Sequence, residues 1–306
     1  MSASSSPPKN EAAGPREVDA AALARHMRRL AQAETPPWLH LEVATRMAER
    51  LPIIKLQPRR VLQWSAFLGA AGALLGTTYP QAEQVCVEPS ALLLARSEAG
   101  QKRAWWQALR GDAVVAVEAA EAVASGRAEL VWANMCLHIN TDLPAALAAW
   151  HAALAVDGFV MFSCLGPDSF VELRPIFERM AWGKTAPEWW DMHDIGDVMV
   201  GVGFADPVMD QERITLTWSD GNALLRDLRA LGGNMAPTRF KGLRGRAWRQ
   251  KLLNELESLR AADGRLRLSL EVVYGHAFKP KPRVQLTAET SFSLEEMRAM
   301  VRRSGA

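Results

Sequence analysis

Short apolar runs and longer amphipathic stretches alternate along the middle of the chain. The apolar runs have the length of a buried strand and are bounded by polar residues: Val61–Trp64, Gln84–Glu88, Ala113–Val117, Leu130–Met135 and Phe159–Cys164. Strands that are apolar throughout and are separated by helices are typical of a parallel sheet covered on both faces. The pattern therefore predicts an α/β protein with a doubly wound, Rossmann-like core over about residues 55–165.

Helices are predicted between these strands and on either side of the core. Gly69–Gly76, a segment from about Ser90, and Leu143–Leu154 separate the strands, and Asp142 can cap the last of these helices. In front of the core, residues 18–51 predict two helices broken at Pro36-Pro37. Behind the core, the pattern predicts helices at Ser169–Met180, Ile195–Val202, Ala223–Leu231 and Arg246–Arg260, and strands at Ile214–Trp218 and Leu266–Tyr274.

These elements divide the chain into five expected segments. Residues 1–17 are rich in Ser, Pro and Ala without a hydrophobic stretch, so we expect a disordered tail and not a secretory signal. The other segments are N-terminal helices over 18–54, the Rossmann-like core over 55–165, a lid with a helical insertion and closing strands over 166–283, and a C-terminal tail over 284–306.

The composition excludes a disordered or fibrous protein. The chain has 306 residues, of which 49% are hydrophobic and 23% charged, as in a soluble globular protein. No apolar stretch approaches the roughly 20 residues that span a bilayer. Cys86, Cys136 and Cys164 lie in or beside apolar runs and are too few for a disulfide framework. We therefore expect free thiols in a reducing compartment, and a cytoplasmic protein without a membrane partner.

The net charge of +2 conceals an uneven distribution. The whole chain has 36 Lys/Arg and 34 Asp/Glu. From Ala230 to Ala306 there are 15 Lys/Arg and 7 Asp/Glu, so this part is basic. The rest of the chain has 21 Lys/Arg and 27 Asp/Glu, so it is acidic. The basic part is densest at Arg239–Lys251. This stretch is either a solvated helix face or a surface that attracts an acidic partner. Nucleic acid is disfavoured, because the chain shows no accompanying binding motif.

Three polar residues end neighbouring strands of the predicted core. Ligands of such sheets bind outside the carboxyl ends of the strands, near the point where the strand order reverses. Glu88 could accept hydrogen bonds from both hydroxyls of a ribose there, although acidic residues also end strands for solubility. Glu118 could face an adenine amino group, and Asn134 would lie beside the reacting end of a nucleoside cofactor.

The loop after the first strand only partly fits this hypothesis. A cofactor loop needs small residues so that its backbone can approach the ligand. The sequence here is VLQWSAFLGAAG, which supplies Gly69 and Gly72 but also Trp64 and Phe67. The two bulky side chains would either fill the cofactor space or force the loop outward.

Several phrases of the sequence resemble a known family. RRVLQ, VCVEPS and ELVWANMCLHIN are similar to the class I S-adenosylmethionine-dependent methyltransferases, and DMHDIGDVMVGVGFADPVMDQERITLTW and LEVVYGHAFKP to the BioC family of biotin synthesis. The resemblance implies a mostly parallel seven-stranded sheet with helices on both faces and a helical lid. It also implies S-adenosylmethionine as cofactor and methylation of the free carboxyl of malonyl-acyl carrier protein.

The resemblance assigns expected roles residue by residue. It makes Glu88 the ribose-binding acid and Glu118 the adenine-side acid, a role for which Asp112 competes. The remaining expected cofactor contacts are Gln63, Ser65, Gly69 and Asn134. For the substrate it indicates His138, which shares a motif with Asn134, and Arg174, a candidate carboxylate clamp. No catalytic acid or base is assigned, because carboxylate methylation depends mainly on positioning and exclusion of water.

The acyl carrier protein would be the acidic partner of the basic stretch. The residues expected to meet it are Arg239, Lys241, Arg244, Arg246 and Arg249.

The sequence departs from the family pattern in two places. The family has an acid at the position of Gln63 and glycines at those of Ser65 and Phe67, and a Tyr-Asp pair where this chain reads AQAETPPWLH. The two tyrosines, Tyr79 and Tyr274, lie elsewhere. An alternative interpretation therefore stays open, in which the protein keeps the fold, has lost the reaction, and acts in binding or assembly.

The remaining polar candidates have simpler interpretations. We expect His193, near a predicted helix start, to be structural and His276, after a strand, to be buried and hydrogen-bonded. The six histidines and three cysteines show no metal-ligand spacing, so no metal site is predicted.

Overall fold

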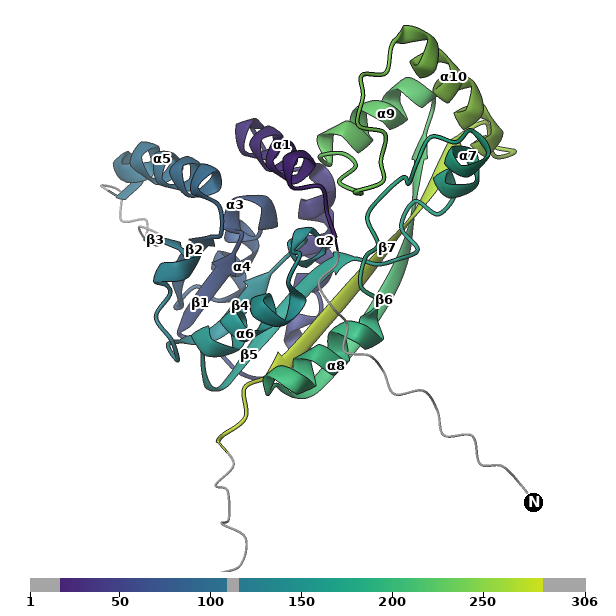
Figure 1. Cartoon of the computed structure of the whole chain (residues 1–306). Coiled ribbons are helices and arrows are strands. Elements are labelled where there is room, and N and C mark those ends of the chain that lie inside the picture. Colours follow the sequence, from purple (N-terminus) through teal and green to yellow (C-terminus); the bar gives the residue numbers. More distant parts are fainter. Residues whose placement is uncertain (1–16, 109–115, 283–306) are drawn as a thin grey trace, which may run out of the picture.

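The described part of the chain forms one seven-stranded sheet with the order β3-β2-β1-β4-β5-β7-β6 (Figure 1). The computed structural model describes residues 17–108 and 116–282. Its strands are β1 Arg60–Trp64, β2 Glu83–Glu88, β3 Ala116–Ala119, β4 Ala128–Ala133, β5 Leu154–Leu165, β6 Ala205–Trp218 and β7 Leu266–Phe278. Strands β1 to β5 pair in parallel, and β7 is antiparallel to both β5 and β6. The predicted Rossmann-like α/β fold is confirmed, and its strand order reverses between β1 and β4.

The helices follow the predicted alternation with the strands. The α-helices are α1 Ala20–Gln32, α2 Trp38–Ala48, α3 Ala66–Gly69, α4 Gly72–Thr78, α5 Ala91–Ala108, α6 Leu143–Ala153, α7 Leu173–Arg179, α8 Met192–Val202, α9 Gly221–Ala230 and α10 Arg246–Leu256. Short 3-10 turns are η1 Leu51–Ile53, η2 Ala120–Ala122, η3 Leu137–Ile139 and η4 Glu257–Leu259. The predicted break between the first two helices is confirmed, with Pro37 at the start of α2. Asp142 caps α6, as predicted, by accepting from the Ala145 amide at 2.9 Å.

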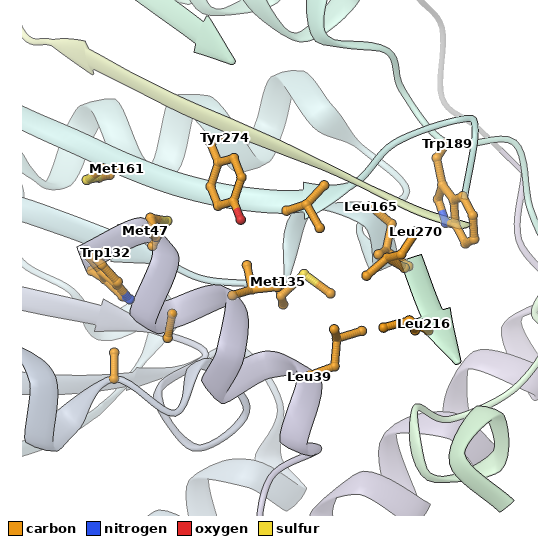
Figure 2. Close-up of a cluster of buried hydrophobic side chains, with 14 of the residues drawn as sticks. Leu39, Met47, Trp132, Met135, Met161, Leu165, Trp189, Leu216, Leu270 and Tyr274 are labelled. Carbon is orange, nitrogen blue, oxygen red and sulfur yellow. The ribbon is translucent and has the colours of Figure 1, made fainter. Parts of the chain in front are cut away.

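Alternate residues of the central strands point to opposite faces and are apolar on both. On one face α2 and α4 pack against side chains of β1, β4 and β5 such as Val61, Trp132 and Met161. Figure 2 shows part of this cluster, including Leu39 and Met47 of α2. On the other face α6 and α8 cover their strand neighbours, which include Leu62, Val131 and Val160. Each apolar run of the sequence therefore contributes side chains to the hydrophobic cores on both faces of the sheet.

The predicted helix Gly69–Gly76 is two helices in the structure. Helix α3 ends where Ala70 takes a left-handed conformation, with φ 53°, and α4 starts at Gly72. A left-handed residue cannot continue a right-handed helix. The single-helix prediction was wrong because nothing in the composition of an Ala/Gly-rich stretch marks such a break.

Strand β6 is much longer than the predicted Ile214–Trp218. It starts at Ala205 and pairs with β7 as far as Trp218, with a register shift between Ala205 and Val208. Pro207 and the charged residues near it concealed the strand, although an edge strand tolerates both. Strand β7 also extends beyond the predicted Tyr274, to Phe278.

The β6–β7 ribbon supports a separate group of helices. We define the lid as α7, α9 and α10 with the connecting residues 180–191 and 231–245, and Figure 1 shows these helices together at one end of β6 and β7. Two predicted helices are shorter here than expected, since α7 begins only at Leu173 and α10 gives way to η4 after Leu256. Within the described residues, no helix has the length and apolar character needed to cross a bilayer. The predicted tails fall largely outside the described residues.

Gly275 tests how closely β7 packs between its neighbours. A Cβ at this position would lie 2.4 Å from Cζ of Phe162 on β5 and 2.9 Å from Sδ of Met209 on β6. We expect Gly275→Ala to lower the free energy of unfolding by about 1–3 kcal/mol through overpacking, measured by urea denaturation. Gly201→Ala on α8 is the matched control, because a Cβ there has nothing within 4 Å. Equal effects of the two substitutions would contradict this packing.

Candidate functional site

The polar strand ends predicted from the sequence meet at the carboxyl edge of the sheet, beside the reversal of strand order. The loops after β1, β2 and β4 converge there, and helices α1 and α2 lie against them.

Glu88 ends β2 with only 1% of its surface exposed. Its Oε1 accepts hydrogen bonds from the Phe67 amide and from Oγ of Ser97, both at 2.8 Å. Its Oε2 is buried and has no partner among the described residues. Burial raises the pKa of Glu88, and the two hydrogen bonds oppose that change. A buried carboxylate oxygen without a donor is costly, so this oxygen fits the hydroxyl of a ligand.

The loop after β1 keeps a conformation that glycine usually supplies. Ser65 is left-handed, with φ 56° and ψ 50°, and its amide donates to the Val87 carbonyl at 2.7 Å. This conformation costs a non-glycine residue roughly 1–2 kcal/mol. The hydroxyl Oγ of Ser65 is fully buried and also lacks a partner among the described residues. A left-handed conformation that glycine usually supplies is therefore present at Ser65 without a glycine.

The two bulky residues of this loop do not behave alike. Trp64 packs edge-on against Trp150 of α6, with ring centroids 6.3 Å apart, and so belongs to a core cluster. Phe67 packs against α1, and the Arg96 guanidinium lies 3.9 Å from its ring centroid. With Ala31, Arg96 and Ser97 it helps to line a cavity of about 330 Å³ beside Glu88. Phe67 therefore forms a wall of this cavity.

Asn134 is the most connected polar side chain of the site. Its Nδ2 donates to the carbonyls of His40 and Gly69, at 2.7 and 2.9 Å, and its Oδ1 accepts from Oγ of Ser163 at 2.6 Å. The residue is completely buried. The carboxamide thereby joins α2, the end of α3, β4 and β5. Its predicted contact with a cofactor stays a prediction.

The other predicted cofactor residues are bonded within the sheet. Nε2 of Gln63 donates to Gln84 at 3.1 Å, and Glu118 forms an ion pair with Arg60 at 3.2 Å. Asp112 lies outside the described residues. Their roles toward a ligand also stay predictions.

A second cavity, of about 360 Å³, lies between the ends of β4 and β5, the N-terminal helices and the lid. Its buried end is lined by His40, Met135, His138 and Leu165. Toward the lid its walls are aromatic: Phe170, Phe177, Trp182, Trp189, Phe240 and Trp248. We call this space the lid cavity.

Three histidines line the lid cavity, and all of them are neutral. Burial lowers the pKa of His40 to about 4, and burial with the neighbouring His40 does the same to His26. Burial also holds the pKa of His138 well below its usual value. Because Nδ1 of His40 lies 2.9 Å from the Leu68 carbonyl, which can only accept, that nitrogen carries the proton. The sequence had indicated His138 alone, since no local motif marks the other two.

The remaining predicted residues are spread over the lid. Arg174 is exposed, donates to the Pro167 carbonyl and lines a different hollow, so the structure does not bring it together with His138. Arg239 forms a 2.9 Å ion pair with Asp19, and Arg244 lies among aromatic rings. The other basic residues, Lys241, Arg246 and Arg249, are exposed. The predicted basic patch is thus divided between the lid cavity and the surface.

The two histidines with simpler interpretations lie apart from both cavities. His193 is in the first turn of α8, where Asp191 caps the helix by accepting from the His193 and Asp194 amides. His276 lies on β7, is only half-buried where burial was expected, and packs edge-on against Phe278. Within residues 17–108 and 116–282, no group of three or more His, Cys, Asp or Glu could hold a metal ion.

Comparison with known proteins gives a consistent set of relatives, although no family model matches the chain. It is 40% identical over 266 residues to a malonyl-[acyl-carrier protein] O-methyltransferase of Gallionella capsiferriformans, covering 84% of this chain and 91% of that protein. It is also 40% identical over 250 residues to the protein of the same name from Laribacter hongkongensis, covering 80% and 84%.

Solved structures show the same fold at much lower identity. The YcgJ protein of Bacillus subtilis matches with a TM-score of 0.51 and 10% identity, covering 79% of this chain and 99% of that one. A structure described as a putative methyltransferase of Bacillus halodurans matches with a TM-score of 0.50 and 13% identity, covering 78% and 100%. These matches bear on the arrangement of helices and strands alone.

Asn134→Ala tests the central role of the carboxamide. The change leaves two buried carbonyls without a donor, so we expect the free energy of unfolding to fall by about 3 kcal/mol in urea denaturation. Asn140→Ala is the control, because the Asn140 side chain is exposed and its Oδ1 accepts from the Asp142 amide at 2.9 Å; this change should cost less than about 1 kcal/mol. Similar losses in the two variants would refute the assignment.

The low pKa of His40 leads us to expect that the protein loses stability in acid. Its pKa is about 4 in the folded protein against 6.5 for the free side chain, so below pH 6.5 the unfolded chain binds a proton that the native chain does not. Protonation of the unfolded chain at this ring therefore lowers the free energy of unfolding by about 3 kcal/mol in total as the pH falls from 6.5 to 4. His40→Asn keeps a donor for the Leu68 carbonyl but cannot titrate. Urea midpoints between pH 7 and 4.5 should fall less steeply in the variant, and an unchanged slope would disprove the assignment.

Proposed function

Because the chain belongs to the malonyl-[acyl-carrier protein] O-methyltransferase family, we propose that it transfers a methyl group from S-adenosylmethionine to the free carboxyl of malonyl-acyl carrier protein. The observation that carries the proposal is the 40% identity over 84% of this chain and 91% of the Gallionella protein. An alignment of this length includes both the strand-end loops and the lid.

The residues at the carboxyl edge of β1 and β2 fit a nucleoside cofactor. Glu88 has one buried oxygen with no donor among the described residues, and the cavity of about 330 Å³ lies beside it. Glu88 would accept from the ribose hydroxyls, and the backbone of residues 65–69 would approach the rest of the molecule. When bound, S-adenosylmethionine supplies a methyl group on a positively charged sulfur, which makes that carbon electrophilic.

The lid cavity supports the second half of the proposal. A carboxylate oxygen is already a nucleophile when ionised, so the protein has to position it and exclude water. Aromatic walls from the lid exclude water, while the neutral His26, His40 and His138 provide polar atoms at the buried end. Nδ1 of His26 and Nδ1 of His138 are buried without a partner among the described residues, so both can bond to a substrate.

The exposed part of the basic stretch supports an acyl carrier protein as partner. Lys241, Arg246 and Arg249 are exposed on the lid, beside the residues that line its cavity. Positive charge at the entrance of a substrate site attracts an acidic partner and raises the association rate. A cytoplasmic location agrees with the free Cys86, Cys136 and Cys164.

The non-catalytic alternative rested on Trp64, Phe67 and the absent tyrosine of the N-terminal helix. Trp64 packs into a core cluster, and Phe67 lies in a cavity wall. No observation on the described residues favours loss of the reaction. We therefore keep methyl transfer as the proposed function.

Methyl transfer can be tested with the purified protein, S-adenosylmethionine and malonyl-acyl carrier protein, with the methylated product detected by mass spectrometry. We expect Glu88→Gln to weaken S-adenosylmethionine binding about tenfold in calorimetry, because the free charged acceptor is lost. Glu83→Gln is the control, since Glu83 starts the same strand and pairs with Arg60 at its exposed end. A wild-type protein that neither binds the cofactor nor transfers the methyl group would overturn the proposal.

A further inference from the structure

Arg244 extends into the lid cavity among three aromatic rings. Its guanidinium carbon lies 4.1 Å from the ring centroid of Trp248, 4.6 Å from that of Phe240 and 5.9 Å from that of Trp182. Its Nη2 donates to the Trp182 carbonyl at 2.6 Å. The rings and this bond hold the guanidinium in place and leave further N–H groups of its planar fork available.

No acidic residue neutralises this charge within the described chain. The described residues that line the lid cavity include no Asp or Glu, and Arg244 forms no ion pair with any of them. Partial burial lowers the pKa of Arg244. Arg239 lines the same cavity but differs, because Asp19 pairs with it at 2.9 Å.

A bound anion would stabilise the partly buried guanidinium of Arg244. Stacking on aromatic faces offsets part of the cost of removing the guanidinium from water. A bound oxyanion would supply the missing charge and two parallel hydrogen bonds, for which the guanidinium fork is well suited.

We propose that Arg244 binds an oxyanion of the acyl substrate inside the lid cavity, and so acts in substrate binding and not in surface docking. The inference rests on the proposed function. Two groups of a carrier-bound malonyl substrate have this chemistry: the free carboxylate of the malonyl group and the phosphodiester of the arm that joins it to the carrier.

Substrate fragments separate these two sources. Malonyl-pantetheine carries the carboxylate without a phosphate, and acetyl-phosphopantetheine carries the phosphate without the carboxylate. We expect Arg244→Gln to weaken calorimetric binding of one of these fragments at least tenfold and to raise KM for malonyl-acyl carrier protein with little change in kcat. Arg244→Lys, which keeps the charge and loses the fork, should fall between the wild type and Arg244→Gln. The affected fragment identifies the bound group.

Arg249→Gln is the matched control. Arg249 belongs to the same basic stretch, is exposed and donates to Oδ1 of Asn222 at 2.6 Å. We expect this variant to bind both fragments like the wild type, and all variants to unfold at wild-type urea concentrations. The inference is overturned if Arg244→Gln binds both fragments as the wild type does, if the wild type binds neither, or if Arg249→Gln loses as much.

The two proposals fail in different ways. The wild type could bind a fragment, lose that binding in Arg244→Gln, and yet transfer no methyl group. That result would refute the proposed function and support the oxyanion site. If the protein transfers the methyl group but Arg244→Gln leaves fragment binding unchanged, the oxyanion site is refuted and the proposed function is supported.

Discussion

The buried carboxamide of Asn134 is the interaction on which the rest of the site depends. It donates to carbonyls of α2 and of the loop after β1, and it accepts from Ser163 on β5. All of these bonds are shielded from water, where an unmet partner is costly and a satisfied network is rigid. The N-terminal helix, the cofactor-type loop and the sheet are therefore fixed relative to one another, and both cavities lie at this junction.

The lid is held to the same framework by charge and by the long β6–β7 ribbon. Arg239 pairs with Asp19, which also caps α1, so one ion pair ties the start of α1 to the lid. The basic surplus of the C-terminal part is consequently used in three ways: to fasten the lid, to line its cavity through Arg244, and to charge its surface. A count of charges along the sequence does not distinguish these uses.

Local sequence patterns predicted the helices and strands whose formation depends on residues that are close together in the sequence. The apolar runs located the core strands, Pro37 marked the break before α2, and Asp142 marked the start of α6. The missed features depend on contacts between distant segments. Most of β6 is stabilised by pairing with β7, and Arg244 is enclosed by rings from two parts of the lid. Neither contact leaves a periodic signal in the sequence.

We propose that the end of β2 and the loop after β1 form the cofactor site, although Ser65 and Phe67 stand at two of the family's glycine positions. The decisive measurement is a crystal structure of the protein with bound S-adenosylhomocysteine. We expect the ribose hydroxyls to lie on Oε2 of Glu88, with Asn134 still bonded to the His40 and Gly69 carbonyls. A nucleoside bound away from Glu88, or a loop displaced from Asn134 to admit it, would show that these residues do not form the cofactor site.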